Sequence, residues 1–329
     1  MTTDMAEIKT IGVLTSGGDS PGMNAAVRAV VRVAVKQGWK VFGIKRGYHG
    51  LISDEVIQMK NNSVSNIIQR GGTILKSARS QEFRTVEGRT KAAETIKKYE
   101  IDALITIGGD GTFTGAEIFG KEYGVKVIGI PATIDNDIIG TDQTIGYDTA
   151  LNTALDAIDK IRDTADAHER MFLVEVMGRD AGFIALEAGI AGGAELSLLP
   201  EEMTNIKDIK SQLKNMLKNQ VRSSLVVVAE GDEHGGAINL AAEIRDDFKK
   251  YDLRVCILGH IQRGGSPTAR DRVLASRLGA ASIKALMDGE NEVMVGMVDN
   301  KLKITPLKEA VTEKKELDRS LIDLARLLR

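Results

Sequence analysis

The sequence is poor in cysteine and proline and has almost no net charge. Its 329 residues contain one cysteine, Cys256, so no disulfide can form within the chain, and the apolar residues around Cys256 predict a buried strand position in a reducing compartment. The 44 Lys and Arg residues nearly cancel the 46 Asp and Glu residues, which gives no field to attract nucleic acid or an anionic membrane. No apolar run approaches the roughly 18 residues of a membrane span, and residues 1–9 lack an apolar signal core. We therefore expect a cytoplasmic protein without nucleic-acid or membrane partners.

Glycine is abundant, and its placement organises the sequence. The chain has 34 glycines but only 5 prolines, and the glycines follow short apolar runs in the manner of ligand-binding loops. Those runs alternate with amphipathic helical segments along the chain, which predicts parallel strands joined by helices. With 43% hydrophobic residues, the chain is long enough for two domains. We predict the α/β class, with two Rossmann-like layered domains and mostly parallel sheets.

Two glycine loops suit phosphate binding. Gly17 and Gly18 lie between a predicted strand and a predicted helix, where backbone N–H groups and the helix N-terminus can cradle an anion. Their spacing matches neither the dinucleotide fingerprint nor the P-loop, so a plain tight turn stays open. In the second loop, Asp110 stands between Gly109 and Gly111, where the backbone can approach a polyphosphate while the carboxylate holds magnesium.

Residues 131–137 end another predicted strand with two carboxylates, Asp135 and Asp137. If the backbone stays extended, residues two apart point to one face, which suits metal binding or general-base chemistry. Asp and Asn are also common turn formers, so an ordinary turn is the competing interpretation. The spacing excludes a calcium-binding loop, because Ile139 and Gly146 occupy positions that need oxygen ligands.

Arginines recur beside these loops. Arg28 and Arg32 are four apart on one helical face and could clamp a single anion, although a solvated basic face is the default interpretation. Arg79 follows a third glycine-marked loop. His260 and Arg263 follow the predicted strand that contains Cys256. So many charged groups at strand ends are improbable for turns alone.

Taken together, these loops resemble one family, the bacterial ATP-dependent 6-phosphofructokinases, along nearly the whole chain. The matching runs are residues 14–24, 69–75, 107–111, 133–137, 148–152, 159–164, 175–179, 191–195, 228–231 and 259–278. The resemblance implies transfer of the γ-phosphoryl group of ATP to the 1-hydroxyl of fructose 6-phosphate, with Mg2+ as cofactor and a cleft between two domains as the active site. The implied domains are residues 1–146 plus 262–312 for ATP, and residues 147–261 plus 313–329 for the sugar.

The resemblance also assigns residues to these tasks. Asp135 is the implied general base, and Asp110 the implied magnesium ligand, with Asp137 as a possible helper. The implied ATP-binding residues are Gly18, Arg79, Ser80, Gly109, Asp110, Gly111 and Thr112. The implied sugar-binding residues are Thr133, Ile134, Asp135, Arg170, Met177, Gly178, Arg179, Glu230, Arg254, His260, Ile261, Gln262 and Arg263. Arg170 and Arg254 would reach the sugar phosphate of a neighbouring subunit in a homotetramer.

An effector site and the phosphoryl donor follow from the same resemblance. ADP or phosphoenolpyruvate would bind through Arg28, Arg32, Arg162, Gly193, Ala194 and Glu195. Asn219 and Val221 replace basic residues of the family, which predicts weakened or altered control. Pyrophosphate-dependent relatives carry Asp at Gly111 and Lys at Ala132, so the small residues here favour ATP. The remaining alternatives are a pyrophosphate-dependent enzyme, a catalytically silent regulatory subunit, and a lipid or NAD kinase that shares only the second glycine loop.

Overall fold

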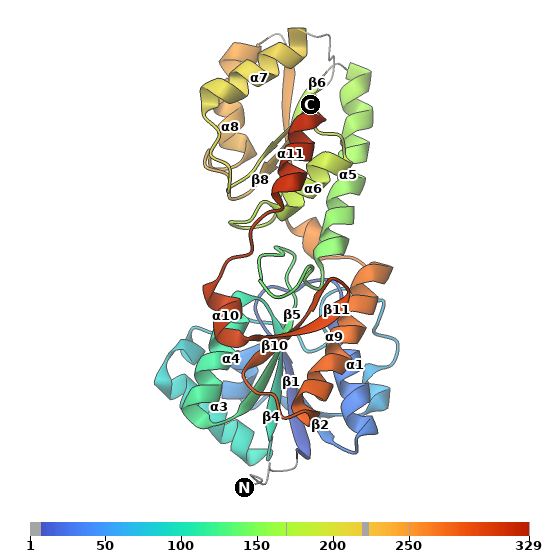
Figure 1. Cartoon of the computed structure of the whole chain (residues 1–329), viewed down its shortest axis with the longest axis vertical. Coiled ribbons are helices and arrows are strands. Elements are labelled where there is room, and N and C mark those ends of the chain that lie inside the picture. The colour runs from blue at the N-terminus through green and yellow to red at the C-terminus, as the bar shows by residue number, and fades with distance from the viewer. Residues whose placement is uncertain (1–7, 169, 219–223, 250, 329) are drawn as a thin grey trace. The chain divides into compact units, whose positions relative to one another are not determined.

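The computed structural model describes residues 8–168, 170–218, 224–249 and 251–328 (Figure 1). Its internal contacts divide the chain into two units. Unit 1 comprises Met1–Ile134, Ile138–Thr149 and Arg263–Lys315, and unit 2 comprises Asp135–Asp137, Ala150–Gln262 and Glu316–Arg329. Apart from Asp135–Asp137, the chain passes between the units after residues 149, 262 and 315, where the sequence analysis expected residues 146, 261 and 312.

Unit 1 contains a seven-stranded sheet in the order β11-β10-β5-β4-β1-β2-β3. The strands are β1 (Thr10–Thr15), β2 (Lys40–Ile44), β3 (Val56–Met59), β4 (Ala103–Gly108), β5 (Lys126–Pro131), β10 (Val293–Val298) and β11 (Lys301–Pro306). The five inner strands are parallel to one another, and the edge strands β3 and β11 are antiparallel to their neighbours. β1 and β4 lie at the centre, where the order of the sheet reverses direction, the usual place for a ligand in such sheets.

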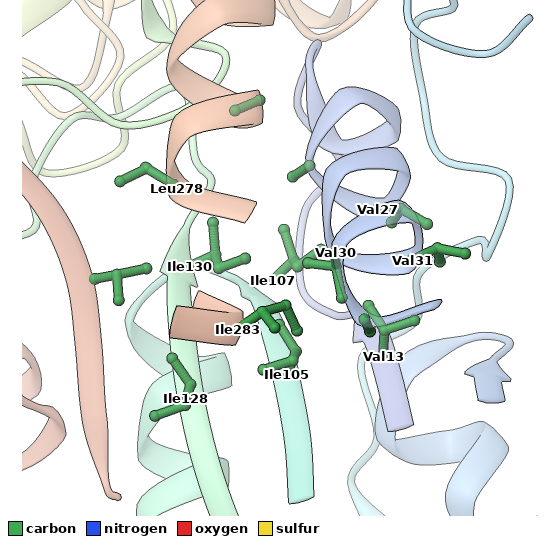
Figure 2. Close-up of a cluster of buried hydrophobic side chains, with 14 of the residues drawn as sticks. Val13, Val27, Val30, Val31, Ile105, Ile107, Ile128, Ile130, Leu278 and Ile283 are labelled. Atoms are coloured by element: carbon green, nitrogen blue, oxygen red, sulfur yellow. The ribbon is translucent and has the colours of Figure 1, made fainter. Parts of the chain in front are cut away.

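Helices cover both faces of this sheet (Figure 1). They are α1 (Met23–Lys36), α2 (Gly47–Ile52), α3 (Val86–Lys98), α4 (Asp110–Tyr123), α9 (Ala269–Met287) and α10 (Leu307–Thr312), with short 3-10 turns at Asn61–Val64 and Glu82–Arg84. Figure 2 shows α1 and α9 on one face, with Val30 and Ile283 packed against Ile105 and Ile107. Each such side chain, fully buried, contributes about 1.5–3 kcal/mol. A second apolar cluster joins α2, α3, α4 and α10 to the opposite face.

Unit 2 is smaller and contains a four-stranded parallel sheet in the order β7-β8-β6-β9. Its strands are β6 (Arg170–Val176), β7 (Leu196–Leu198), β8 (Ser224–Ala229) and β9 (Asp252–Ile257). Its helices are α5 (Tyr147–His168), whose first turn belongs to unit 1, α6 (Phe183–Ala191), α7 (Ile206–Lys218), α8 (Ala237–Ile244) and α11 (Arg319–Leu327), with 3-10 turns at Arg245–Phe248 and Gly259–Arg263. α7 and α8 pack on one face, and α6 and α11 lie on the other (Figure 1).

The predicted α/β class with mostly parallel sheets is confirmed. One local expectation was wrong. Cys256 is only half-buried, because β9 is an edge strand. The condition of an extended backbone from Asp135 to Asp137 is not met, since Asn136 has a φ of 56°. Across the described residues, no helix has the length and hydropathy needed to cross a membrane.

Candidate active site

The loops after β1 and β4 are fastened to each other in unit 1. The backbone N–H of Ser16 donates to the carbonyl of Ile107 (3.0 Å), and the Thr112 hydroxyl donates to the carbonyl of Ser16 (3.1 Å). A Cβ on Gly108 would come within 2.4 Å of Thr112 Oγ1 and 2.5 Å of Ser16 O, so only glycine permits this approach. The two predicted phosphate loops are therefore neighbours at the centre of the sheet.

The second of these loops opens helix α4. Gly109 is the N-cap residue, and no side chain caps this end of the helix, where the backbone N–H of Thr112 donates to the Gly109 carbonyl (3.0 Å). Asp110 and Gly111 form the exposed first turn, and a Cβ on Gly111 would meet no atom within 4 Å. A helix N-terminus without a side-chain cap favours a nearby anion, and phosphate binding at this loop stays a prediction.

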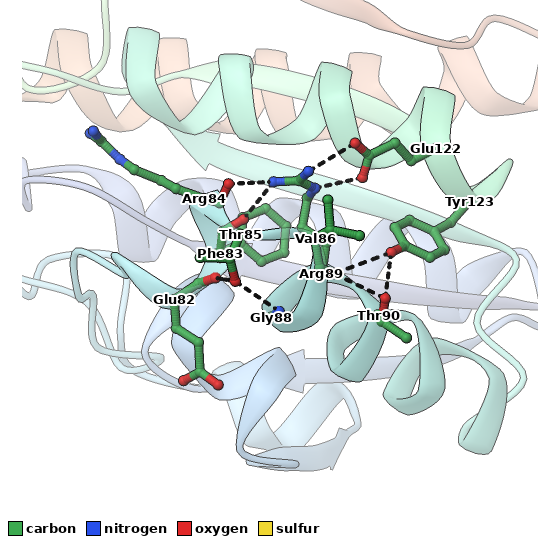
Figure 3. A network of polar contacts seen from close by, with 10 residues as sticks. All are labelled: Glu82, Phe83, Arg84, Thr85, Val86, Gly88, Arg89, Thr90, Glu122 and Tyr123. Atoms are coloured by element: carbon green, nitrogen blue, oxygen red, sulfur yellow. Dashed lines mark hydrogen bonds and ion pairs between the residues drawn. The ribbon is translucent and has the colours of Figure 1, made fainter.

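Arg89 anchors the segment that follows Arg79 and Ser80, through contacts with Phe83, Arg84 and Glu122 (Figure 3). Arg89 is 7% exposed, and its guanidinium donates to both carboxylate oxygens of Glu122 on α4 (2.5 and 2.8 Å). It also donates to the carbonyls of Phe83 (3.1 Å) and Arg84 (2.8 Å). The hydrogen bond with Glu122 raises the pKa of Arg89. Arg89 therefore ties the segment just after Ser80 to the helix that carries Asp110.

Asn24 is a buried residue of this region to which the sequence assigned no role of its own. Its side-chain amide donates to the carbonyls of Arg70 (3.0 Å) and Gly71 (3.2 Å) and accepts from the backbone N–H of Ile74 (2.7 Å). It thereby fixes the glycine loop that leads to Arg79. A Cβ added at the adjacent Gly71 would lie 2.2 Å from the carbonyl oxygen of Gly265, two residues after Arg263.

The acidic stretch after β5 is partly buried. Asp135 is 8% exposed and Asp137 is half-buried. Because Asn136 adopts a left-handed conformation, the argument from an extended backbone does not place both carboxylates on one face. Just before this stretch, the carbonyl of Thr133 accepts from the Thr144 hydroxyl (2.6 Å). Thr133 and Ile134 belong to unit 1 and Asp135 to unit 2.

In unit 2 the carboxyl ends of β6, β8 and β9 converge. Glu230, after β8, accepts from the backbone N–H groups of Gly178 (3.3 Å) and Arg179 (2.6 Å), which follow β6. Gln262 is fully buried, and its side-chain oxygen accepts from the backbone N–H of Met177 (2.9 Å). Glu230 and Gln262 therefore shape the loop of Met177 to Arg179 through its backbone. The side chains of Arg179, His260 and Ile261 are exposed.

Arg170 and Arg254 share one carboxylate at the edge of the same sheet. Arg170 Nε lies 2.8 Å from Asp252 Oδ2, and Arg254 Nε lies 2.8 Å from Asp252 Oδ1. The hydrogen bonds from Arg254 and then Arg170 lower the pKa of Asp252. The family resemblance implied a binding role for both arginines but none for Asp252.

The predicted effector residues fall into two groups. In unit 1, burial and the nearby charge of Arg32 lower the pKa of Arg28. In unit 2, Arg162 donates to the carbonyls of Gly192 (3.0 Å) and Gly193 and lies 3.6 Å from Glu195. Ala194, between Gly193 and Glu195 in the sequence, is half-buried. Asn219 and Val221 lie outside the described residues.

Asp271 is a buried carboxylate that the sequence reasoning missed. It is 1% exposed and accepts from the backbone N–H groups of Gly146 and Thr149 (2.8 Å each) and from the Thr149 hydroxyl (2.5 Å). Burial raises its pKa, while these hydrogen bonds act in the opposite direction. Asp271 therefore joins α9 to the start of α5. The pattern Thr268-x-x-Asp271 after Pro267 was the available signal, because it is a helix-start pattern.

Glycine loops, arginines and acidic side chains at the ends of parallel strands are typical of α/β enzymes that bind phosphorylated ligands. The family model described as "Phosphofructokinase" matches residues 10–286. The chain belongs to the phosphofructokinase family.

Curated relatives extend this match over nearly the full chain. The chain is 54% identical over 324 residues to ATP-dependent 6-phosphofructokinase 2 of Bacteroides thetaiotaomicron, covering 98% of this chain and 99% of that protein. It is 56% identical over 321 residues to ATP-dependent 6-phosphofructokinase 1 of Thermus thermophilus, with the same coverage.

Solved structures agree in fold. The phosphofructokinase of Saccharomyces cerevisiae superposes with a TM-score of 0.86 at 36% identity over 97% of this chain, which spans 46% of the yeast chain. The pyrophosphate-dependent phosphofructokinase of Marinobacter aquaeolei, at 23% identity and a TM-score of 0.83 over 95% of this chain and 86% of that one, shares the fold.

Proposed function

We propose that this protein transfers the γ-phosphoryl group of ATP to the 1-hydroxyl of fructose 6-phosphate, giving fructose 1,6-bisphosphate and ADP in glycolysis. The observation that carries the proposal is the identity of 54% and 56% to two ATP-dependent 6-phosphofructokinases over 98% of the chain. The glycine at residue 111 supports ATP as the donor. An aspartate there would place a negative charge beside the loop that we assign to the nucleotide, and would partly fill the space around Gly111.

We assign the nucleotide to the loops of unit 1. The backbone of Gly18 and residues 109–112 would bind the phosphates, with Arg79 and Ser80 at the next loop. Phosphoryl transfer depends chiefly on positioning and on neutralising the charge of the transferred group, which suits backbone N–H groups and arginines.

We assign magnesium to Asp110. Among the described residues there is no group of three or more His, Cys, Asp or Glu side chains that could hold a metal. A magnesium ion that also binds nucleotide phosphates and water needs only one or two carboxylates from the protein, so the exposed Asp110 fits this role. The ion would supply charge neutralisation on the phosphates when bound.

We assign the sugar to the convergent loops of unit 2 together with Thr133, Ile134 and Arg263. Asp135 would accept the proton of the attacking 1-hydroxyl, because a base must lie within hydrogen-bond reach of that proton. Glu230 and Gln262 hold the backbone of Met177, Gly178 and Arg179, so their contribution is to keep this loop in the binding shape. Arg170 and Arg254 would bind the 6-phosphate of a sugar in a neighbouring subunit of a homotetramer.

The test measures phosphorylation of fructose 6-phosphate with ATP and, separately, with pyrophosphate, for the wild type and Asp135→Asn. We expect activity with ATP alone, reduced by about a hundred- to ten-thousandfold in the variant. Asp156→Asn, an exposed ion-pair partner of Lys160, serves as the control with unchanged activity. Activity with pyrophosphate would overturn the choice of donor, and inactivity with both donors would favour a silent regulatory subunit.

We further propose an effector site for ADP or phosphoenolpyruvate that uses Arg28, Arg32, Arg162, Gly193, Ala194 and Glu195. The mutual proximity of Arg28 and Arg32, and of Arg162 and Glu195, supports the two parts of this site. Because Asn219 and Val221 lack the charge of the family's residues, control should be weak or altered. Titration of the activity with each effector, and light scattering for the tetramer, test these statements. Strong activation by micromolar ADP would contradict the expectation of weak or altered control.

A further inference from the structure

At the edge of the unit 2 sheet, the pairing register of two strands brings one carboxylate and two guanidinium groups together. Arg170 on β6 pairs directly with Asp252 on β9. Arg254 is two residues beyond Asp252 on the same strand, so the side chains of Asp252 and Arg254 lie on one face of the sheet. Cross-strand neighbours on one face lie within reach of long side chains. The sequence Asp-Leu-Arg therefore places a carboxylate between two guanidinium groups.

The contacts leave the outer ends of both arginines available. Arg170 reaches Asp252 through Nε (2.8 Å), and Arg254 through Nε (2.8 Å) and Nη2 (3.0 Å). Neither terminal nitrogen of Arg170, nor Nη1 of Arg254, makes another hydrogen bond within the described part of the chain. The carboxylate thus holds each guanidinium group by its inner edge.

The charges of the cluster favour a further anion. Two guanidinium groups and one carboxylate leave a net positive charge, and the side chains are 27%, 42% and 55% exposed for Arg170, Asp252 and Arg254. A planar guanidinium group with a fixed orientation binds phosphate oxygens with less loss of side-chain freedom than a mobile one. Without Asp252 the two arginines would repel each other and lose their common orientation.

We propose that Asp252 is a positioning residue that aligns Arg170 and Arg254 so that their outer N–H groups bind one phosphate monoester together. The proposal rests on the proposed function, in which these arginines bind the 6-phosphate of the sugar. The alternative, in which Asp252 competes with the phosphate for the arginines, predicts the opposite change in affinity and is decided by the same experiment.

The experiment compares steady-state kinetics of the wild type, Asp252→Asn and Asp252→Glu. We expect Asp252→Asn to raise the KM for fructose 6-phosphate about tenfold, because charge-assisted hydrogen bonds orient the arginines. The kcat and the KM for ATP should stay within about twofold of the wild type, as for a binding effect that does not enter the chemical step. Asp252→Glu, which keeps the charge on a longer side chain, should give an intermediate KM and covers the case in which the amide variant folds poorly.

Two controls separate positioning from a general effect of lost charge. Asp54→Asn removes an exposed carboxylate paired with Lys98 in unit 1, with a side chain 40% exposed, and should change neither KM. In an Arg254→Met background, Asp252→Asn should raise the KM by much less than in the wild type, because the two residues act through one contact.

The outcomes are distinct. An unchanged or lower KM for fructose 6-phosphate in Asp252→Asn, in an otherwise active enzyme, overturns the positioning role and leaves the proposed function intact. A wild type that does not phosphorylate fructose 6-phosphate overturns the proposed function itself.

Discussion

The guanidinium group of Arg263 lies directly over the backbone of Gly18, where a Cβ atom would come within 2.6 Å of Arg263 Nη1. Arg263 also donates to the carbonyl of Asp19 (3.4 Å). A residue assigned to the sugar and a residue assigned to ATP are thus in contact within unit 1. The glycine is required here by the neighbouring side chain, since its own backbone is not in the left-handed region.

Gly18→Ala should therefore damage kinetics more than stability. The colliding atom is the end of a flexible side chain, so Arg263 can move away at little cost to folding. We expect the KM for fructose 6-phosphate to rise about tenfold, the loss of one charge-assisted contact, with a melting temperature close to that of the wild type. Steady-state kinetics and calorimetry measure the two effects. An equal KM in Gly18→Ala and the wild type would contradict the assignment of Arg263.

Gly111→Asp should weaken ATP binding without disturbing the fold. A Cβ at residue 111 meets no atom within 4 Å, so the side chain can be accommodated. Its negative charge would repel the nucleotide phosphates at a helix N-terminus, and we expect the KM for ATP to rise by on the order of tenfold or more. Gly111→Ala is the control for size and should change this KM much less. A similar effect of both substitutions would show that space and not charge decides.

Arg89→Lys should destabilise unit 1 although it keeps the charge. Lysine cannot reproduce the paired hydrogen bonds to Glu122 together with those to the carbonyls of Phe83 and Arg84 (Figure 3). We expect the free energy of unfolding to fall by about 2 kcal/mol in urea titrations. Lys91, in the same helix as Arg89, forms an exposed ion pair with Glu82 of the preceding 3-10 turn, and Lys91→Arg should leave the free energy of unfolding unchanged. Equal stability of Arg89→Lys and the wild type would mean that the network adds little.

Asp247 should make stability depend on acidic pH. Hydrogen bonds from Lys210 and then Lys214 lower the pKa of Asp247 to about 2. Because the folded-state pKa is depressed, its contribution is fully present above the ordinary pKa of an aspartate and is lost as the pH falls from about 4 to about 2. Asp247→Asn should flatten the pH dependence of the urea midpoint in this range. Asp246→Asn, at the neighbouring residue, should retain the slope of the wild type, and a flattening in both variants would argue against the assignment.

Local patterns predicted most of the helices and parallel strands, because each has an apolar run or an amphipathic period of its own. The hairpin of β10 and β11 was not predicted, although Asp299 and Asn300 form its two-residue turn with φ of 48° and 60°. Asp-Asn is a weaker hairpin signal than Asn-Gly. Polar and apolar residues do alternate in β11, but its apolar side chains, Leu302 and Ile304, are exposed and do not contribute to the core. The four residues of the short strand β3, which was also missed, show no alternation.

The sequence by itself determined the chemistry available to this protein: glycine loops, arginines and carboxylates at strand ends, and the family to which they belong. Those features are local, since each depends on a few consecutive residues. Only the tertiary structure decided which of them meet. Asp252 lies between Arg170 and Arg254 because two strands pair in one register, and Asp271 caps α5 from 122 residues away at Thr149. Such contacts depend on packing between distant segments, which no single stretch of sequence encodes.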